Sequence, residues 1–241
     1  FADDNPAERE IVRSQLNISA PEISSPEDYI RIFDRNGFFE PTSISKDDIS
    51  RNEMYKANAE RTRFAARFES YSDYLLSLNM TAEIEPFSSV YLPRITQLTN
   101  KSNQFNLTTK RYTQNEIEEI SRNRGYIHLY GRLEDKFGDN GVVSVIIGKI
   151  EGGDLHIDLW LMSCRVLKRD MEYAMLDSLV EKCREKNIKN IYGYYYKTKK
   201  NSMVSGLYKQ FGFIELYENE KGDSKWLLDI SVYKNKNNVI L

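Results

Sequence analysis

The chain has 241 residues, of which 40% are hydrophobic and 29% charged, and its 34 Lys and Arg residues nearly balance 36 Asp and Glu residues. This balance excludes a strong field of one sign, so neither nucleic acid nor an acidic membrane surface is expected as a partner. No apolar stretch approaches the ~20 residues that span a bilayer, and no secretory signal opens the sequence, which favours a cytoplasmic protein. Two cysteines and two histidines are too few for a separate zinc site.

The first residues, Phe-Ala-Asp-Asp-Asn-Pro, indicate an extended segment that passes into a helix, because Pro6 suits the first helical turn. Asp3 and Asp4 lie at this junction, where adjacent carboxylates hold Mg²⁺ through oxygen ligands. Alternatively, Asp4 or Asn5 caps the helix. Because the chain opens with Phe1 at the apparent end of a strand, we expect it to be a piece of a longer polypeptide.

The next part of the chain is predicted to be helical and loop-rich. Residues 17–42 read as loops around a short helix over 26–33, and residues 45–78 carry the apolar periodicity of amphipathic helices. Farther on, Thr113 and Glu116 form a capping box that starts a helix at about Gln114. We place a domain boundary near residue 80, which divides the chain into residues 1–80 and residues 81–241.

The C-terminal half alternates strands and helices. Strands are predicted over 126–133, 142–150 and 155–163, and the Gly152-Gly153-Asp154 break predicts an antiparallel hairpin between the last two. A helix over 171–186, a strand over 188–196, a helix over 201–210 and a strand over 224–232 follow. The order predicts an α/β (α+β) fold with a mixed central sheet of about five or more strands flanked by helices.

Cys164 lies where a predicted strand ends and a long helix begins, and it is followed by Arg165, Lys168 and Arg169. A helix N-terminus and nearby cations lower the pKa of a thiol, which makes it a nucleophile. The alternative is a small apolar side chain packed at a strand end beside solvated cations.

The sequence offers four possible bases for Cys164, namely His128, Asp135, Asp139 and His156. His156 is excluded, because eight strand residues at about 3.3 Å each place it roughly 26 Å from Cys164. His128, Asp135 and Asp139 remain candidates for the general base, although Asp135 and Asp139 equally suit a turn.

Residues 201–213 resemble the closing helix and strand of GNAT-type acyltransferases, in which an asparagine, a Leu-Tyr pair and a Gly-Phe pair recur at this spacing. The resemblance implies a GNAT-like mixed sheet and assigns Asn201 and Tyr208 to the binding of CoA. In GNAT enzymes a glycine-rich loop wraps the CoA pyrophosphate. The corresponding loop here, 165–170, contains no glycine.

Several motifs in order make the whole chain similar to the FkbH-like family. Residues 1–10 resemble the last motif of HAD phosphatases of subfamily IIIC, and the likeness continues through residues 91–112, 135–141 and 163–166. The resemblance implies the end of a HAD domain, whose Asp3 and Asp4 bind Mg²⁺ in the complete domain, fused to an acyltransferase domain. Phosphatase activity would belong only to the longer parent protein.

Members of this family take a three-carbon acyl group from 1,3-bisphosphoglycerate and deliver it to an acyl carrier protein. The resemblance implies that Cys164 carries the acyl group. We expect Arg165, Lys168 and Arg169 to hold the phosphate of the incoming phosphopantetheine at the helix start.

Two alternatives remain open. The first is a GNAT-type acyltransferase that moves an acyl group from CoA directly to an amine or hydroxyl, without a covalent intermediate. The second is a non-catalytic module that docks a carrier protein.

Overall fold

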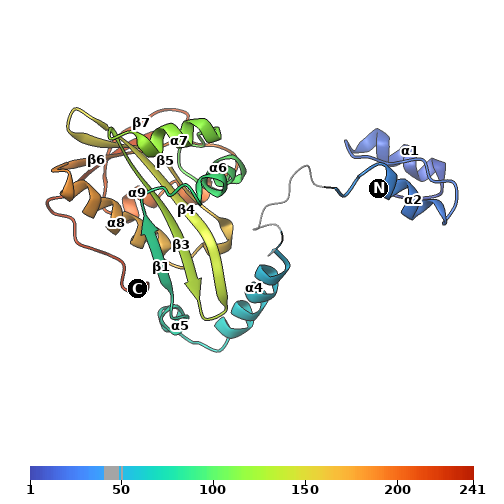
Figure 1. Cartoon of the computed structure of the whole chain (residues 1–241), viewed down its shortest axis with the longest axis horizontal. Coiled ribbons are helices and arrows are strands. Elements are labelled where there is room, and N and C mark those ends of the chain that lie inside the picture. Colours follow the sequence, from blue (N-terminus) through green and yellow to red (C-terminus); the bar gives the residue numbers. More distant parts are fainter. Residues whose placement is uncertain (41–48, 50) are drawn as a thin grey trace. The chain divides into compact units, whose positions relative to one another are not determined.

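The computed structural model describes residues 1–40, 49 and 51–241, which form two compact units, Phe1–Ser50 and Arg51–Leu241 (Figure 1). The predicted boundary near residue 80 therefore falls too late. Residues 51–80 belong with the second unit, because Tyr74, Leu75, Leu78 and Met80 are buried in the main core of its sheet. The start of the predicted helical stretch, residues 45–48, lies outside the described residues.

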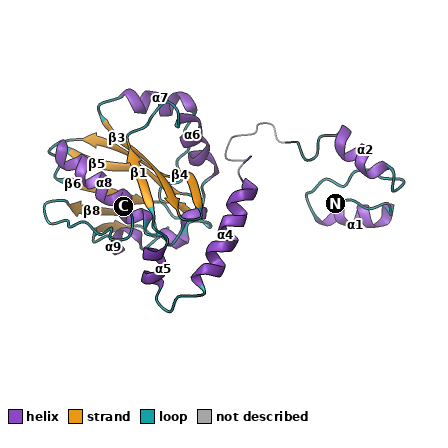
Figure 2. Ribbon diagram, turned by 60° about the horizontal axis from the view of Figure 1, so that its bottom comes forward, coloured by secondary structure: helices purple, strands orange, loops and turns teal. Residues whose placement is uncertain are grey.

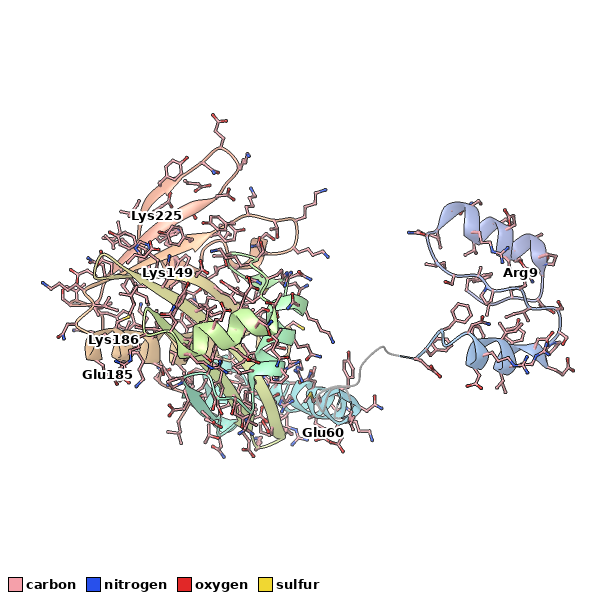
Figure 3. The ribbon with its side chains drawn as sticks, turned by 45° about the horizontal axis from the view of Figure 1, so that its top comes forward. Arg9, Glu60, Lys149, Glu185, Lys186 and Lys225 are labelled. Carbon is pink, nitrogen blue, oxygen red and sulfur yellow. The ribbon has the colours of Figure 1, made fainter. Side chains whose placement is uncertain are left out.

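The first unit contains helices α1 (Pro6–Gln15) and α2 (Asp28–Arg35). Asn5 caps α1 by accepting a hydrogen bond from the backbone N–H of Ala7, and Pro6 occupies the first turn as predicted. Arg9, labelled in Figure 3, fastens this unit by donating to the carbonyls of Asp3 and Ile23 and to the carboxylate of Glu22.

The second unit is built on one sheet with the strand order β1-β3-β4-β5-β6-β8-β7, to which the short β2 is added beside β5. All pairs are antiparallel except β5 with β6, which is parallel. The predicted mixed α/β fold with helices flanking the sheet is confirmed. The strands are β1 (Thr81–Glu85), β2 (Phe105–Asn106), β3 (Tyr126–Asp135), β4 (Gly138–Glu151), β5 (Asp154–Met162), β6 (Asn190–Tyr195), β7 (Ile214–Glu218) and β8 (Ser224–Asp229).

Helices cover both faces of this sheet (Figure 2). On one face, α6 (Leu92–Lys101) and α7 (Gln114–Arg122) pack on a core that contains Tyr130, Val145 and Leu159. On the other, α5 (Tyr71–Ser77), α8 (Met171–Glu185) and α9 (Leu207–Gln210) pack on the larger core around Trp160. Helix α4 (Arg51–Ala65) completes the unit. No helix in the described part of the chain is long and apolar enough to span a bilayer.

The predicted strands and helices of the second unit are largely confirmed. The Gly152-Gly153 hairpin joins β4 to β5, and both hydrogen bonds of the Thr113 capping box are present at the start of α7. The predicted helix over 201–210 is a 3-10 turn at Ser202–Val204 followed by α9. Strands β1 and β7 were not predicted, and every residue of β7 is exposed.

The parallel pair β5 and β6 meets only at Leu155 with Ile191 and His156 with Tyr192. Beyond these pairs the residues after β2 fill the space between the strands. The backbone N–H of Leu107 donates to the carbonyl of Trp160, and the carbonyl of Leu107 accepts from the N–H of Tyr196. Where β5 and β6 diverge, the backbone of Leu107 therefore pairs with N–H and carbonyl groups that would otherwise lack a partner.

A substitution at Gly193 of β6 would show how tightly this region is packed. A Cβ at Gly193 would lie 2.4 Å from Cε1 of Tyr208, whose ring is fully buried against Phe213 and Trp226. We expect Gly193→Ala to lower the free energy of unfolding by about 1–3 kcal/mol, because a rigid ring must move. Urea unfolding measures the change. Gly206→Ala, where no atom lies within 4 Å of the added Cβ, is the control and should stay within about 0.5 kcal/mol of the parent.

Candidate active site around Cys164

Cys164 is exposed and begins a short turn between β5 and α8. Ser163 fixes the start of this turn: its N–H donates to the carbonyl of Val143, and its Oγ accepts from the N–H and Nε of Arg165. A 3-10 turn over Cys164–Val166 follows. The other cysteine, Cys183, is buried in the main core, and burial raises its pKa to about 12. Of the two thiols, only that of Cys164 is accessible.

The loop after Cys164 adopts the left-handed backbone conformation twice without a glycine, at Lys168 (φ 63°) and at Asp170 (φ 60°). Such conformations are costly for residues with a side chain and need support from their surroundings. Tyr71 of α5 gives that support by donating a hydrogen bond to the carbonyl of Lys168. Among the hydrogen bonds of the described residues, none is donated by the backbone N–H groups of residues 168–170.

Beneath the loop lies a buried network of charged side chains. The carboxylate of Asp135, which is fully buried, accepts from Nε of Arg61 at 2.8 Å and from an NH group of Arg169 at 3.0 Å. Arg169 also donates to Asn140, to Asn58 and to the carbonyl of Arg165. Burial and the neighbouring Arg61 hold the pKa of Arg169 below its usual range.

This network corrects two predictions from the sequence. Arg169 was expected to hold phosphate, but its guanidinium is buried and already bonded to Asp135. Asp135 was a candidate base, but its carboxylate is paired with two arginines and bonded to the backbone N–H of Phe137. Both residues therefore support the turn from below.

Helix α4 contributes three residues to this site, at positions 54, 58 and 61, which share one helical face. Asn58 accepts from Arg61 at 2.9 Å and from Arg169 at 3.3 Å, and Met54 contacts the guanidinium of Arg165. The adjacent Glu60, labelled in Figure 3, is exposed. The sequence alone does not predict this contribution, because polar residues on one helical face do not reveal whether they face water or a buried charge.

The other two candidate bases do not meet Cys164. His128 pairs with Ile147 of β4, and Ile147 pairs with Leu159 of β5. Cys164 follows Leu159 by five residues, so at about 3.3 Å per residue it lies about 17 Å along the sheet from the level of His128. Nδ1 of His128 accepts a hydrogen bond from the N–H of Phe87, and burial lowers its pKa. Asp139 lies in the β3–β4 hairpin, where its carboxylate pairs with Arg132 at 2.7 Å and accepts from the N–H of Gly141.

Asn201 and Tyr208, assigned to CoA binding by the resemblance, are fully buried and have internal partners. Asn201 donates to the carbonyls of Asn106 and Tyr196 and accepts from the N–H of Thr198. The hydroxyl of Tyr208 bonds to the backbone of Tyr194. Burial also raises the pKa of Tyr208. In this structure both side chains hold β6 and the loop after it in place.

His156 belongs to a separate aromatic cluster. Its Nδ1 is 2.7 Å from the hydroxyl of Tyr194, and its ring stacks on Tyr192 at 4.7 Å. Nζ of Lys225, a residue labelled in Figure 3, lies 4.6 Å from the centre of the Tyr192 ring.

A carboxylate that the sequence did not single out lies at the start of α8. One oxygen of Glu172 is buried without a hydrogen-bond partner, and burial raises its pKa to about 6. From the sequence alone, an acidic residue in a first helical turn is more simply explained by the helix dipole.

In the first unit, Asp3 and Asp4 lie just before α1, as predicted. Oδ1 of Asp3 accepts from the N–H of Asn5, so one carboxylate oxygen supports the helix cap. Among the described residues, no third Asp, Glu, His or Cys joins this pair to complete a metal site. Magnesium binding stays a prediction.

No family model matches the chain, and a comparison with curated proteins finds no match. Among solved structures, the ribosomal-protein-S18-alanine N-acetyltransferase of Escherichia coli is similar with 12% identity and a TM-score of 0.47, covering 66% of this chain and 99% of that one. An acetyltransferase of the GNAT family from Staphylococcus aureus Mu50 is similar with 14% identity and a TM-score of 0.47, covering 62% and 99%.

The spermidine N-acetyltransferase of Vibrio cholerae, solved with CoA and spermine, gives 12% identity and a TM-score of 0.49, covering 63% of this chain and 96% of that one. At these identities and TM-scores, the likeness says nothing about the reaction or the substrate of this chain.

The buried carboxylate of Asp135 predicts a large effect on stability. We expect Asp135→Asn to lower the free energy of unfolding by about 3–5 kcal/mol, because it leaves two buried guanidinium groups without a counter-charge. Asp139→Asn is the matched control: it weakens a half-exposed ion pair on the same hairpin and should cost less than about 1 kcal/mol. Chemical denaturation of the two variants gives the comparison, and equal losses would contradict the role assigned to Asp135.

The exposure of the two thiols predicts selective labelling. In the folded chain, iodoacetamide should modify Cys164 and leave Cys183 unmodified, because Cys183 is buried and its pKa is raised to about 12. Peptide-resolved mass spectrometry measures both sites. Labelling in denaturant, where both thiols should react, is the control.

Proposed function

We propose that the second unit is an acyltransferase domain that carries a small hydroxyacyl group as a thioester on Cys164, between an acyl phosphate and the phosphopantetheine thiol of an acyl carrier protein. The observation that supports this most directly is the exposed thiol of Cys164 at a turn held from three sides, by β4, by α4 and by α5. The acyl phosphate, such as 1,3-bisphosphoglycerate, and the carrier come from the resemblance to the FkbH-like family.

The proposed chemistry has two balanced steps. The Cys164 thiolate attacks the carbonyl carbon of the acyl phosphate, a C–S bond forms, the C–O bond to phosphorus breaks, and phosphate leaves. The carrier thiolate then attacks the thioester carbonyl, and Cys164 leaves as a thiolate with the electron pair of its C–S bond. No redox partner is needed.

The residues that would hold an anionic group are the exposed Lys168 and the backbone N–H groups of residues 168–170. These groups lie in the loop that follows Cys164, and together they favour a phosphate. Arg165 lies in the same turn, beside Ser163 and Met54. Arg169 is not assigned this role, because its guanidinium is buried and both of its NH groups already donate to acceptors within the protein.

The bound phosphopantetheine would supply the acceptor thiol. We expect it to reach Cys164 from the exposed side of its turn, because the thiol is accessible there.

Intact-mass spectrometry tests the proposal. After exposure to 1,3-bisphosphoglycerate or to a hydroxyacyl thioester, the chain should gain one acyl group, and peptide mapping should place it on Cys164. Cys164→Ser should reduce the acyl-enzyme by at least about 100-fold, because a hydroxyl at its ordinary pKa is a weak nucleophile.

Two results would contradict the covalent route. Micromolar binding of acetyl-CoA by calorimetry, with transfer that survives Cys164→Ser, would instead support the CoA-dependent alternative. Carrier binding without any acyl-enzyme in the wild-type chain would support the docking module.

A further inference from the structure

The segment that follows β6, residues 196–203, carries three lysines and no carboxylate. We call it the lysine loop. Lys197, Lys199 and Lys200 are exposed, and none of them takes part in an ion pair within the described part of the chain. Like charges so close in sequence repel one another weakly in water, and an acidic surface placed against them would turn this repulsion into attraction.

The turn between β7 and β8 lies beside the lysine loop and does not cancel its charge. The backbone N–H of Lys197 donates to Oδ1 of Asp223 at 2.9 Å, and Oδ2 of Asp223 accepts from the side chain of Asn219. Residues 218–225 add three carboxylates and two lysines. The two segments together therefore hold five lysines against three carboxylates, which leaves a surplus of positive charge at this edge of the sheet.

The backbone of the lysine loop is held from inside the protein. Oδ1 of the fully buried Asn201 accepts from the N–H and the hydroxyl of Thr198 at 2.8 and 3.0 Å. The amide nitrogen of Asn201 donates to the carbonyls of Asn106 and Tyr196, and the hydroxyl of Thr198 accepts from the N–H of Lys200. A backbone fixed in this way presents its exposed side chains in a constant arrangement, which lowers the entropy cost of binding a partner.

The lysine loop lies at the same end of the sheet as Cys164. Strands β5 and β6 are parallel, and Cys164 follows the end of β5 as the lysine loop follows the end of β6. Leu107 bonds to the carbonyl of Trp160 on one side and to the N–H of Tyr196 on the other. Two strand spacings, roughly 10 Å, therefore separate the two chain segments at this level. A protein seated on the lysine loop would lie close to the accessible thiol.

The composition of the lysine loop indicates the kind of partner that fits it. Besides its lysines it presents Tyr196 and Met203, whose side chains are 41% and 53% exposed. Tyrosine and methionine are enriched in the centres of protein–protein interfaces, and charged residues are typical of the rim. Nucleic acid is bound instead through many phosphate contacts along a basic stripe, which a small surplus of lysines does not provide. An acidic protein is therefore favoured over nucleic acid.

We propose that the lysine loop is the docking surface for the acyl carrier protein, and that the carrier meets it with an acidic face. The inference rests on the proposed function, because it names where the acceptor of that reaction binds. Attraction between opposite charges would speed the encounter and orient the carrier. Its phosphopantetheine arm would then reach along the end of the sheet to Cys164.

Fluorescence anisotropy with a labelled acyl carrier protein in its apo form, which lacks the arm, measures docking to the full chain. Lys197→Gln, Lys199→Gln and Lys200→Gln combined should raise Kd about tenfold, because three exposed attractions are lost. The matched control combines Lys186→Gln, Lys189→Gln and Lys234→Gln, which removes the same charge near the opposite end of β6 (Lys186 is labelled in Figure 3). Its Kd should stay within about twofold of the parent, because distant charges are screened.

A charge reversal and a salt series separate docking from any effect on the fold. Lys199→Glu should weaken docking more than Lys199→Gln does, while both keep the parent's Tm within about 2 °C, because the position is exposed. Raising the salt concentration should weaken docking to the parent more than docking to the triple lysine-loop variant, because fewer charges remain to be screened in the variant.

Three results would overturn the inference. They are equal Kd values for the lysine-loop variant and its control, no binding of the apo carrier by the parent chain, and binding of a short single-stranded oligonucleotide as tight as that of the carrier. The docking measurement needs neither an acyl donor nor Cys164. Acylation of Cys164 by an acyl phosphate, measured separately, should be equal in the parent and the lysine-loop variant. Its absence in the parent would contradict the proposed function and leave the docking comparison valid.

Discussion

The organisation of the second unit around Cys164 depends on the buried carboxylate of Asp135. This one group, at the end of β3, bonds to Arg61 of α4 and to Arg169 of the turn before α8. It thereby joins a helix, a hairpin and a loop that are far apart in sequence. A hydrophobic contact at the same place would also join them, but it would not orient them, whereas forked hydrogen bonds to a carboxylate fix both distance and angle.

The exposed thiol and the buried residues beneath it have different roles. The groups near the surface, Cys164 and Lys168, are free to meet a substrate, whereas the groups beneath them are occupied with one another. The strained backbone at Lys168 and Asp170 is tolerated because Tyr71 and Arg169 hold the loop from α5 and from below. Precise placement of a nucleophile requires this kind of rigid surrounding.

The sequence predicted the strands that alternate between apolar and polar residues or that run through the core, such as β3, β4 and β5, because burial imposes a visible period. It did not predict β7, whose residues are all exposed, or β1, whose five residues are too few for a clear pattern. The position of Cys164 at a strand end was predicted correctly. Its surroundings were not, because whether Arg169 meets solvent or Asp135 depends on packing between residues 34 positions apart.

The same limit explains the residues of the GNAT-like motif. Asn201 and Tyr208 were recognisable by spacing, yet spacing does not show that their polar atoms already have partners inside the protein. The sequence also does not show that α4 belongs with the sheet, because the apolar pattern of an amphipathic helix does not reveal which unit the helix packs against.

The bridge that Leu107 forms between Trp160 of β5 and Tyr196, just after β6, also bears on how the chain folds. It joins the two halves of the sheet, and the nearby hydrogen bond from Asn201 to Asn106 closes a sequence separation of 95 residues. Closing so long a loop restricts the unfolded chain before any of these bonds can form. Each half of the sheet is therefore expected to assemble first, with residues 105–107 locking them together as a late event on the folding pathway.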